Sequence, residues 1–170
     1  MLLFDGAMGT MLQQAGLPAG ACPEILNIER PTFITDIHRQ YIAAGADIIE
    51  TNTFGANPLK LADYDLAEKA AAINQQAVKA ALLAKDAGGN RIKIAGAVGP
   101  TGKFIYPLGD LDFEAAYQAY LTQITALAAA GVDMIIIETI IDIQEMRAAL
   151  LAAKQATSLP VICQLSFSAD

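Results

Sequence analysis

The sequence predicts an α/β protein built around a parallel sheet. Apolar strand segments alternate with segments of helical periodicity along the chain, the order expected for parallel strands joined by right-handed crossover helices. Residues 92–98 and 134–137 are almost continuously apolar, as expected for strands covered on both faces. These observations suit either a (β/α)8 barrel or a doubly wound sheet.

One strand plan occurs twice, as AAGADIIETNTFGAN in residues 43–57 and as AAGVDMIIIETI in residues 129–140. In each copy a glycine and an aspartate precede a short apolar run, at Gly45 and Asp47 and at Gly131 and Asp133. This alignment places Glu138 level with Asn52. Because ligands of α/β enzymes bind at the carboxyl ends of parallel strands, we expect both residues at one mouth.

Five segments are predicted to form strands, each short and mostly apolar: residues 1–4, 47–50, 92–98, 133–139 and 159–167. A complete (β/α)8 barrel takes about 250 residues, whereas this chain has 170. We therefore expect residues 1–170 to be one unit, the first five strands and four helices of an incomplete barrel with two open sheet edges.

Four segments are predicted to form the crossover helices: from Pro31 to Gly45, from the capping-box pattern of residues 65–68 to Gly88-Gly89, from Asp112, and from residues 142–145. The glycines after Asp5 predict a turn that brings backbone N–H groups close to a ligand. Residues 12–29 contain several Gly and Pro and no clear period, so we expect a loop with at most a short helix.

Composition limits the possible partners. The chain is 54% hydrophobic with 17% charged residues, which fits one globular domain. A net charge of −7 without a basic cluster argues against nucleic acid and anionic membranes as partners. No apolar run is long enough to span a bilayer and no basic leader is present, so we expect a cytoplasmic protein. Cys22 and Cys163 lack metal-site or disulfide spacing and are expected to be free buried thiols.

Two carboxylates are the strongest candidates for a site. Asp5 ends the first predicted strand and Glu138 the fourth, so in a barrel both point to the same mouth. No Lys or Arg lies nearby in sequence, and a ligand ammonium group would supply the missing positive charge. The alternative is that Asp5 caps its own glycine turn and that Glu138 pairs with a helix N-terminus.

Weaker candidates surround these two acids. Thr51, Asn52 and Thr53 could orient a ligand, or they could form a turn whose side chains bond one another. The loop of residues 99–102 could present amides to an anion but lacks phosphate-loop spacing. His38 lies within a predicted helix and is expected to be a packing or surface group. The residues alone thus indicate an acidic, amide-lined mouth for a small zwitterion or amine.

Five motifs together resemble those of the homocysteine S-methyltransferase domain, and most closely the homocysteine-binding module of cobalamin-dependent methionine synthases. The motifs are DGAMGTML (5–12), CPEILN (22–27), HRQYIAAGADIIETNTFGAN (38–57), GPTGKFIYPLG (99–109) and MIIIET (134–139). They follow the family's order and spacing over essentially the whole chain. The resemblance implies a (β/α)8 barrel.

The resemblance also implies a reaction. Homocysteine would bind with its ammonium group near Asp5 and Glu138 and its carboxylate near Gly6 and Thr53. Zinc held by cysteine thiolates would lower the pKa of the substrate thiol, which would then attack a methyl group. In the cobalamin-dependent enzymes that methyl group comes from methylcobalamin, recharged from methyltetrahydrofolate, on the cobalamin and folate modules of the same longer chain.

One feature departs from the family pattern. The zinc-binding cysteines of the family belong to later strands, which are expected beyond Asp170, and neither Cys22 nor Cys163 matches them. We therefore expect residues 1–170 to contain no zinc ligand, to be part of a longer enzyme and to be inactive alone. Three alternatives remain open: a homocysteine methyltransferase using betaine, S-methylmethionine or a fused folate reductase; a non-catalytic, self-associating half-barrel; and an unrelated phosphate-binding barrel.

Overall fold

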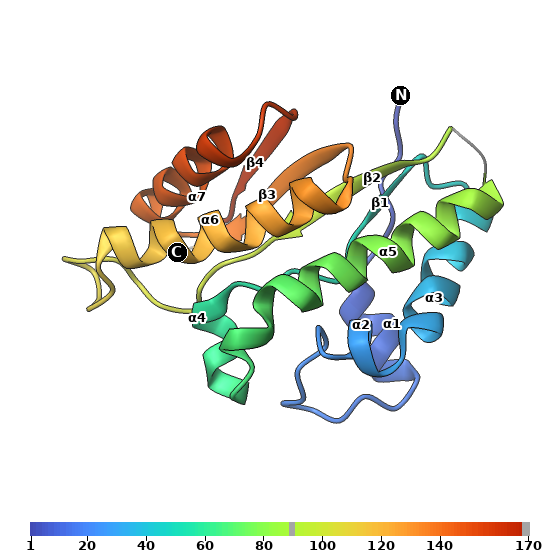
Figure 1. Cartoon of the computed structure of the whole chain (residues 1–170), viewed down its shortest axis with the longest axis horizontal. Coiled ribbons are helices and arrows are strands. Elements are labelled where there is room, and N and C mark those ends of the chain that lie inside the picture. Colours follow the sequence, from blue (N-terminus) through green and yellow to red (C-terminus); the bar gives the residue numbers. More distant parts are fainter. Residues whose placement is uncertain (89–90, 168–170) are drawn as a thin grey trace.

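Four parallel strands form one sheet in the order β1-β2-β3-β4. In the computed structural model, which describes residues 1–88 and 91–167, the strands are β1 (Ile48–Glu50), β2 (Lys93–Val98), β3 (Met134–Ile140) and β4 (Val161–Leu165). In Figure 1 the colours run in sequence order across the molecule, so consecutive strand–helix units lie side by side. The predicted α/β class with a parallel sheet is confirmed.

The first predicted strand is reduced to a single contact. Phe4 forms an isolated parallel bridge with Ile48, and the carbonyl of Leu3 accepts the N–H groups of Asp47 and Ile48 at 2.8 and 3.1 Å. Met1 and Leu2 extend beyond this contact and are exposed. The neighbouring strand β1 has only three residues, so no longer ladder forms. The described residues therefore contain four strands, and a single bridge at Phe4 stands where the first of the five strands was expected.

Four long helices make the connections: α3 (Pro31–Ala43), α5 (Ala70–Gly88), α6 (Phe113–Ala130) and α7 (Ile143–Ala156). Neighbouring helices pack against one another and against the strands that they join (Figure 1). The predicted caps of the last two helices are confirmed, because Asp112 accepts the Glu114 N–H at 2.8 Å and Asp142 accepts the Gln144 N–H at 2.8 Å. Gly89, expected at the end of α5, lies outside the described residues.

The predicted capping box before α5 is wrong. The chain passes through α4 (Pro58–Leu61) and the 3-10 turns η1 (Ala62–Tyr64) and η2 (Ala67–Lys69) before α5 begins. Asp65 ends η1 with a left-handed φ of 58° and makes no capping bond to η2. An N-cap needs extended backbone, so Asp65 cannot serve as one.

Residues 5–29 contain two short helices. They are α1 (Met8–Gln14) and α2 (Leu26–Glu29), where a turn and a loop with at most one short helix were predicted. Gly9 lies inside α1, so the expected glycine turn is confined to Gly6 and Ala7. Leu12 and Leu26 pack with Ile34 in a small core beside α3. Burial of these leucines fixes both helices in spite of the Gly and Pro residues around them.

Side chains of the sheet alternate between two cores, as expected for extended strands. Those on the outer face pack against the helices and include Ile49, Ile94, Ile135 and Ile137. Those on the inner face form a separate cluster of Ile48, Ala95, Ala97 and Ile136. Burying each isoleucine stabilises the fold by about 1.5–3 kcal/mol. The same alternation directs the next inner-face positions, Glu50 and Glu138, into the interior above this cluster.

The repeated aspartates hold the strands in register. Asp47 accepts the Leu3 N–H at 3.0 Å, and Asp133 accepts the Ile94 N–H at 2.9 Å. Asp133 is also paired with Lys85 at 3.2 Å and Lys93 at 3.1 Å. The glycine–aspartate part of the sequence repeat is therefore structural.

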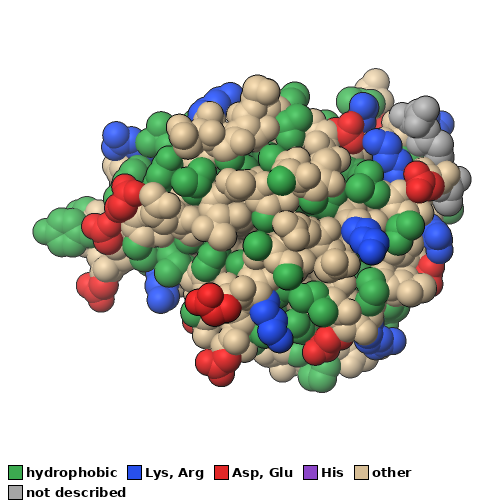
Figure 2. All heavy atoms as spheres, in the orientation of Figure 1, with side chains coloured by type: hydrophobic (Ala, Val, Ile, Leu, Met, Phe, Trp, Pro, Cys, Tyr) green, Lys and Arg blue, Asp and Glu red, His purple; other side chains and the backbone are tan. Residues whose placement is uncertain are grey.

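The surface carries charges of both signs. On the face drawn in Figure 2, Lys and Arg side chains lie interspersed with Asp and Glu. Among the described residues, no helix combines the length and the apolar character needed to cross a bilayer.

Candidate functional site

A pocket of about 470 Å³ lies at the carboxyl ends of β1 and β3, beside the segment that follows Phe4. Asp5 and Glu138 both line it, although 133 positions separate them in the chain. The predicted convergence of these two carboxylates is confirmed. The pocket is lined by Asp5, Gly6, Ala7, Met8, Gly9, Pro23, Glu24, Glu50, Thr51, Asn52, Thr53, Phe54, Ala97 and Glu138.

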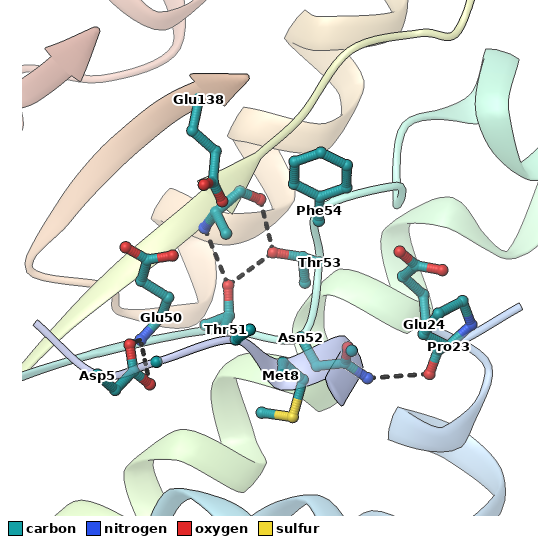
Figure 3. Close-up of a pocket in the computed structure, with 14 residues that line it drawn as sticks. Asp5, Met8, Pro23, Glu24, Glu50, Thr51, Asn52, Thr53, Phe54 and Glu138 are labelled. Atoms are coloured by element: carbon teal, nitrogen blue, oxygen red, sulfur yellow. Dashed lines mark hydrogen bonds between the residues drawn. The ribbon is translucent and has the colours of Figure 1, made fainter. Parts of the chain in front are cut away.

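Three carboxylates, Asp5, Glu50 and Glu138, form what we call the acid wall of the pocket. Figure 3 shows Glu50 between Asp5 and Glu138. The backbone N–H of Glu50 donates to both carboxylate oxygens of Asp5, at 3.1 Å each. These bonds fix the Asp5 side chain against the end of β1.

Glu138 lies at an irregular point of β3. The pairing of β3 with β4 shifts register between Ile137 and Ile140, and Thr139 has a φ of 61°. A left-handed backbone is costly for a β-branched residue, of the order of 1–3 kcal/mol. Such irregularities commonly re-aim side chains next to active sites, and here Glu138 lines the pocket.

The acid wall is electrostatically unfavourable when empty. Burial raises the pKa of Asp5 to about 7, against the lowering effect of its backbone hydrogen bonds. Burial, followed by the charges of Glu138 and Asp5, raises the pKa of Glu50 to about 8. Burial also raises the pKa of Glu138. Among the described residues that line the pocket, none is Lys, Arg or His, so no side chain neutralises these acids.

Thr51, Asn52 and Thr53 form a second part of the pocket lining, which we call the polar wall. The Thr53 hydroxyl donates to the Ala97 carbonyl at 2.7 Å, and the Thr51 hydroxyl accepts the Ala97 N–H at 3.1 Å. The two hydroxyl oxygens lie 2.6 Å apart, so Thr51 donates to Thr53 (Figure 3). The two side chains bond each other, as the turn alternative predicted, and they also join the end of β1 to β2.

The Asn52 amide is also engaged within the protein. Its Nδ2 donates to the Pro23 carbonyl at 2.9 Å and to Asn27 Oδ1 at 3.1 Å, and Asn27 donates back to the Asn52 carbonyl at 2.8 Å. Both amide hydrogens are thus used to hold the loop before α2 at the edge of the pocket. The polar wall thus shapes the pocket, and the polar hydrogens of its side chains are already bonded within the protein.

Asp5 does not cap its own glycine turn and Glu138 does not cap a helix N-terminus, the two alternatives to a ligand site. Asp5 accepts the N–H of Glu50, on the neighbouring strand, rather than capping the glycine turn. The N-terminus of α7, which follows Glu138, is capped by Asp142. Charge on the acid wall therefore stays available to a ligand.

Close packing explains one glycine that lines the pocket, Gly6, and one that contacts its lining residue Phe54, Gly99. A Cβ on Gly6 would lie 3.1 Å from the ring of Tyr41, whose hydroxyl donates to the Ala7 carbonyl at 3.1 Å. A Cβ on Gly99 would lie 2.7 Å from the ring and the carbonyl oxygen of Phe54. Gly99 thereby lets Phe54 sit over the pocket.

The loop of residues 99–102 binds a carboxylate of the protein itself, that of Glu145. The carboxylate of Glu145, on α7, accepts the Thr101 N–H at 2.7 Å and the Thr101 hydroxyl at 2.6 Å. Tyr120 donates to the same oxygen at 2.9 Å. One of the amides considered for a phosphate, that of Thr101, thus binds Glu145, which is buried, and the loop is fixed to α7.

The described residues do not fit a zinc site. No three of their His, Cys, Asp and Glu side chains form a group that could hold a metal ion. The zinc-binding cysteines of the family are expected beyond Asp170, and Asp170 itself lies outside the described residues, which end at Phe167. The position of the zinc ligands therefore stays a prediction.

The two cysteines and the histidine of the chain have structural surroundings. Cys22 is buried and donates to Glu24 at 3.2 Å, and burial, with the charge of Glu24, raises its thiol pKa to about 11. Cys163 is exposed, contrary to expectation, because β4 is the open edge of the sheet. His38 is fully buried, as a packing residue.

Sequence reasoning missed Glu50 as a member of the site. The tetrapeptide IIET occurs twice, at residues 48–51 and 136–139, and would have paired Glu50 with Glu138. Aligning the repeats on glycine and aspartate hid this match, because β3 is longer than β1. The residues at the carboxyl end of the repeat, rather than its glycine and aspartate, therefore indicate the site.

The chain is similar to known proteins in sequence and in fold. The family model described as homocysteine S-methyltransferase matches residues 2–170. The chain belongs to the homocysteine S-methyltransferase family. It is 35% identical over 165 residues to a methionine synthase of Mycobacterium leprae and 36% identical to one of Mycobacterium tuberculosis. The alignments cover 92% of this chain and 14% of either relative.

Solved homocysteine methyltransferase structures share the fold. The metallated form of MmuM from Escherichia coli superposes with a TM-score of 0.80 at 27% identity, covering 99% of this chain and 63% of that one. Its oxidized form gives a TM-score of 0.79 and covers 98% of this chain and 62% of that one. The four parallel strands therefore form part of the barrel-like fold of this family.

Proposed function

We propose that this chain is the homocysteine-binding part of an enzyme that methylates the homocysteine thiol to give methionine. The observation that carries the proposal is the acid wall, which meets no cationic side chain among the described residues of the pocket. A buried anionic cluster binds an ammonium group well, because the ligand supplies the charge that the site lacks. Family membership supports homocysteine as the source of that ammonium group.

The walls suggest an orientation for the substrate. The ammonium group would lie between Asp5 and Glu138. The substrate carboxylate would lie toward the backbone at Gly6, because the acid wall repels it. Asn52 and Thr53 would contact the substrate without donating hydrogen bonds to it, because their side-chain hydrogens are already bonded within the protein. In this orientation the acid wall selects an amino acid over a simple thiol.

We further propose methylcobalamin, recharged from methyltetrahydrofolate on separate modules, as the source of the methyl group. The similarity to mycobacterial methionine synthases supports this donor. We expect residues 1–170 alone to bind homocysteine without transferring a methyl group, since they span less than two thirds of the superposed methyltransferases.

A second candidate is a homocysteine methyltransferase that uses betaine or S-methylmethionine. The similarity to the Escherichia coli homocysteine methyltransferase supports it. Methyl-transfer assays with each donor, on a chain that includes the remaining barrel, would separate the two candidates.

Calorimetric titration with L-homocysteine tests the proposal. We expect Glu138→Gln to weaken binding about tenfold to hundredfold, because it removes a charge-assisted hydrogen bond to the ammonium group. Glu68→Gln, at an exposed position on η2, is the matched control and should bind as the wild type does. Equal affinities for the wild type and Glu138→Gln would remove Glu138 from the site.

A further inference from the structure

Glu50 is the one member of the acid wall that the proposed substrate contacts leave unused. Its carboxylate lies between those of Asp5 and Glu138 (Figure 3). Its own N–H holds both oxygens of Asp5 at 3.1 Å, so Asp5 cannot move away from it without losing two hydrogen bonds. Glu138 approaches from β3 and is close enough to hydrogen-bond with the Glu50 side chain. The fold therefore fixes three acids together.

The groups around Glu50 offer it no positive charge. Glu24, a fourth acid of the pocket, accepts the Gly55 N–H at 2.7 Å and the Cys22 thiol at 3.2 Å. Tyr41 lies behind Asp5, and burial, with the charge of Asp5, raises its pKa, so it is a neutral phenol. Like charges held this close cannot all ionise in a partly buried site. The empty pocket must therefore keep a proton near neutral pH.

Glu50 holds this proton together with Glu138, to which its side chain is hydrogen-bonded. Its pKa of about 8 is above that of Asp5, about 7, and both are raised first by burial. Glu50 lies between the other two acids of the wall (Figure 3), and the charges of both oppose its ionisation. A carboxyl that is protonated in the empty site changes charge most easily when a cation enters.

We propose that Glu50 is a substrate-positioning residue for homocysteine, and that entry of the substrate ammonium group displaces a proton from the acid wall to solvent. This inference rests on the proposed function. In the empty pocket the proton of the Glu50 carboxyl is shared with Glu138. On binding, that O–H bond breaks, the proton leaves to solvent, and the Glu50 carboxylate accepts an N–H of the ammonium group. A ligand without the ammonium group gives no such exchange.

Calorimetry in buffers of different ionisation enthalpy measures the released protons directly. At about pH 7.5 we expect wild-type protein to release up to roughly 0.8 proton per homocysteine, the protonated fraction of a group with a pKa near 8. Glu50→Gln should release almost none and should bind about tenfold more weakly at about pH 8.5. At about pH 6 the two affinities should converge. Glu68→Gln should behave as the wild type does.

The compound 4-sulfanylbutanoate keeps the thiol and carboxylate of homocysteine and lacks the ammonium group. No binding, or binding without proton release, agrees with the proposal, and this arm needs only the wild-type protein if Glu50→Gln fails to fold. Homocysteine binding without proton release, or with the same release in folded Glu50→Gln, would overturn the role of Glu50 and leave the proposed function intact. Absence of any homocysteine binding by the wild type would overturn both.

Discussion

The two walls of the pocket are built from polar residues that use their polar atoms differently. On the polar wall, the hydroxyls of Thr51 and Thr53 are bonded to each other and to Ala97. On the acid wall, Asp5, Glu50 and Glu138 face one another without a cationic partner among the described lining residues. Polar groups that satisfy each other hold a fold together, whereas charges left unneutralised in a pocket indicate a ligand.

The largest effect expected from this comparison is on the stability of the polar wall. Thr53→Val leaves the Thr51 hydroxyl without its acceptor and the Ala97 carbonyl with only the longer bond from Gln123, at 3.3 Å. We expect the free energy of unfolding to fall by about 2 kcal/mol. Chemical denaturation of the ligand-free protein measures this loss.

The same variant should change homocysteine binding little. We expect its affinity to stay within about threefold of the wild type, because the Thr53 hydroxyl is already bonded to the protein. Thr125→Val, at an exposed position on α6, is the matched control and should leave both quantities unchanged. A large loss of affinity without a loss of stability would move Thr53 to the ligand-binding wall.

An effect of similar size is expected from the acid wall, and it depends on pH. The folded-state pKa values of Asp5 and Glu50, about 7 and about 8, are raised above their ordinary values of 3.8 and 4.5. The unfolded chain therefore ionises first as pH rises, and the ligand-free protein loses stability between about pH 4 and pH 8. At about pH 8.5, Glu50→Gln should be more stable than the wild type by about 2 kcal/mol, allowing for partial exposure.

The difference between the two proteins should vanish at about pH 4, where Glu50 is protonated in both states. Burial lowers the pKa of His38 in the folded protein to about 4, so protonation of His38 weakens folding only below about pH 6.5. This contribution is the same in both proteins, so the difference between their stability curves reports on Glu50 alone. A difference that does not vary with pH would mean that Glu50 has the same pKa in the folded and the unfolded protein.

Where apolar pattern and burial coincide, the sequence was sufficient to predict the fold. The strands β2 and β3, and the caps Asp112 and Asp142, follow from local pattern and are present. The first strand and the capping box of residues 65–68 failed because tertiary context decided them. Phe4 meets a strand only three residues long, and Asp65 adopts a left-handed turn.

The site was predictable in part for the same reason. Asp5 and Glu138 were placed correctly because parallel strands bring their carboxyl ends to one edge. Glu50 was missed because its single position at the end of a three-residue strand carries no periodic signal, and only the repeated IIET reveals it. The internal bonding of Asn52 and Thr53 depends on Pro23, Asn27 and Ala97, which lie far away in sequence.

The most direct test of the central claim is a crystal structure of this chain with bound L-homocysteine. We predict that the ammonium nitrogen lies about 3 Å from carboxylate oxygens of Asp5 and Glu138, with the substrate carboxylate turned away from both. An ammonium group facing solvent, or bound by groups outside the acid wall, would contradict the account.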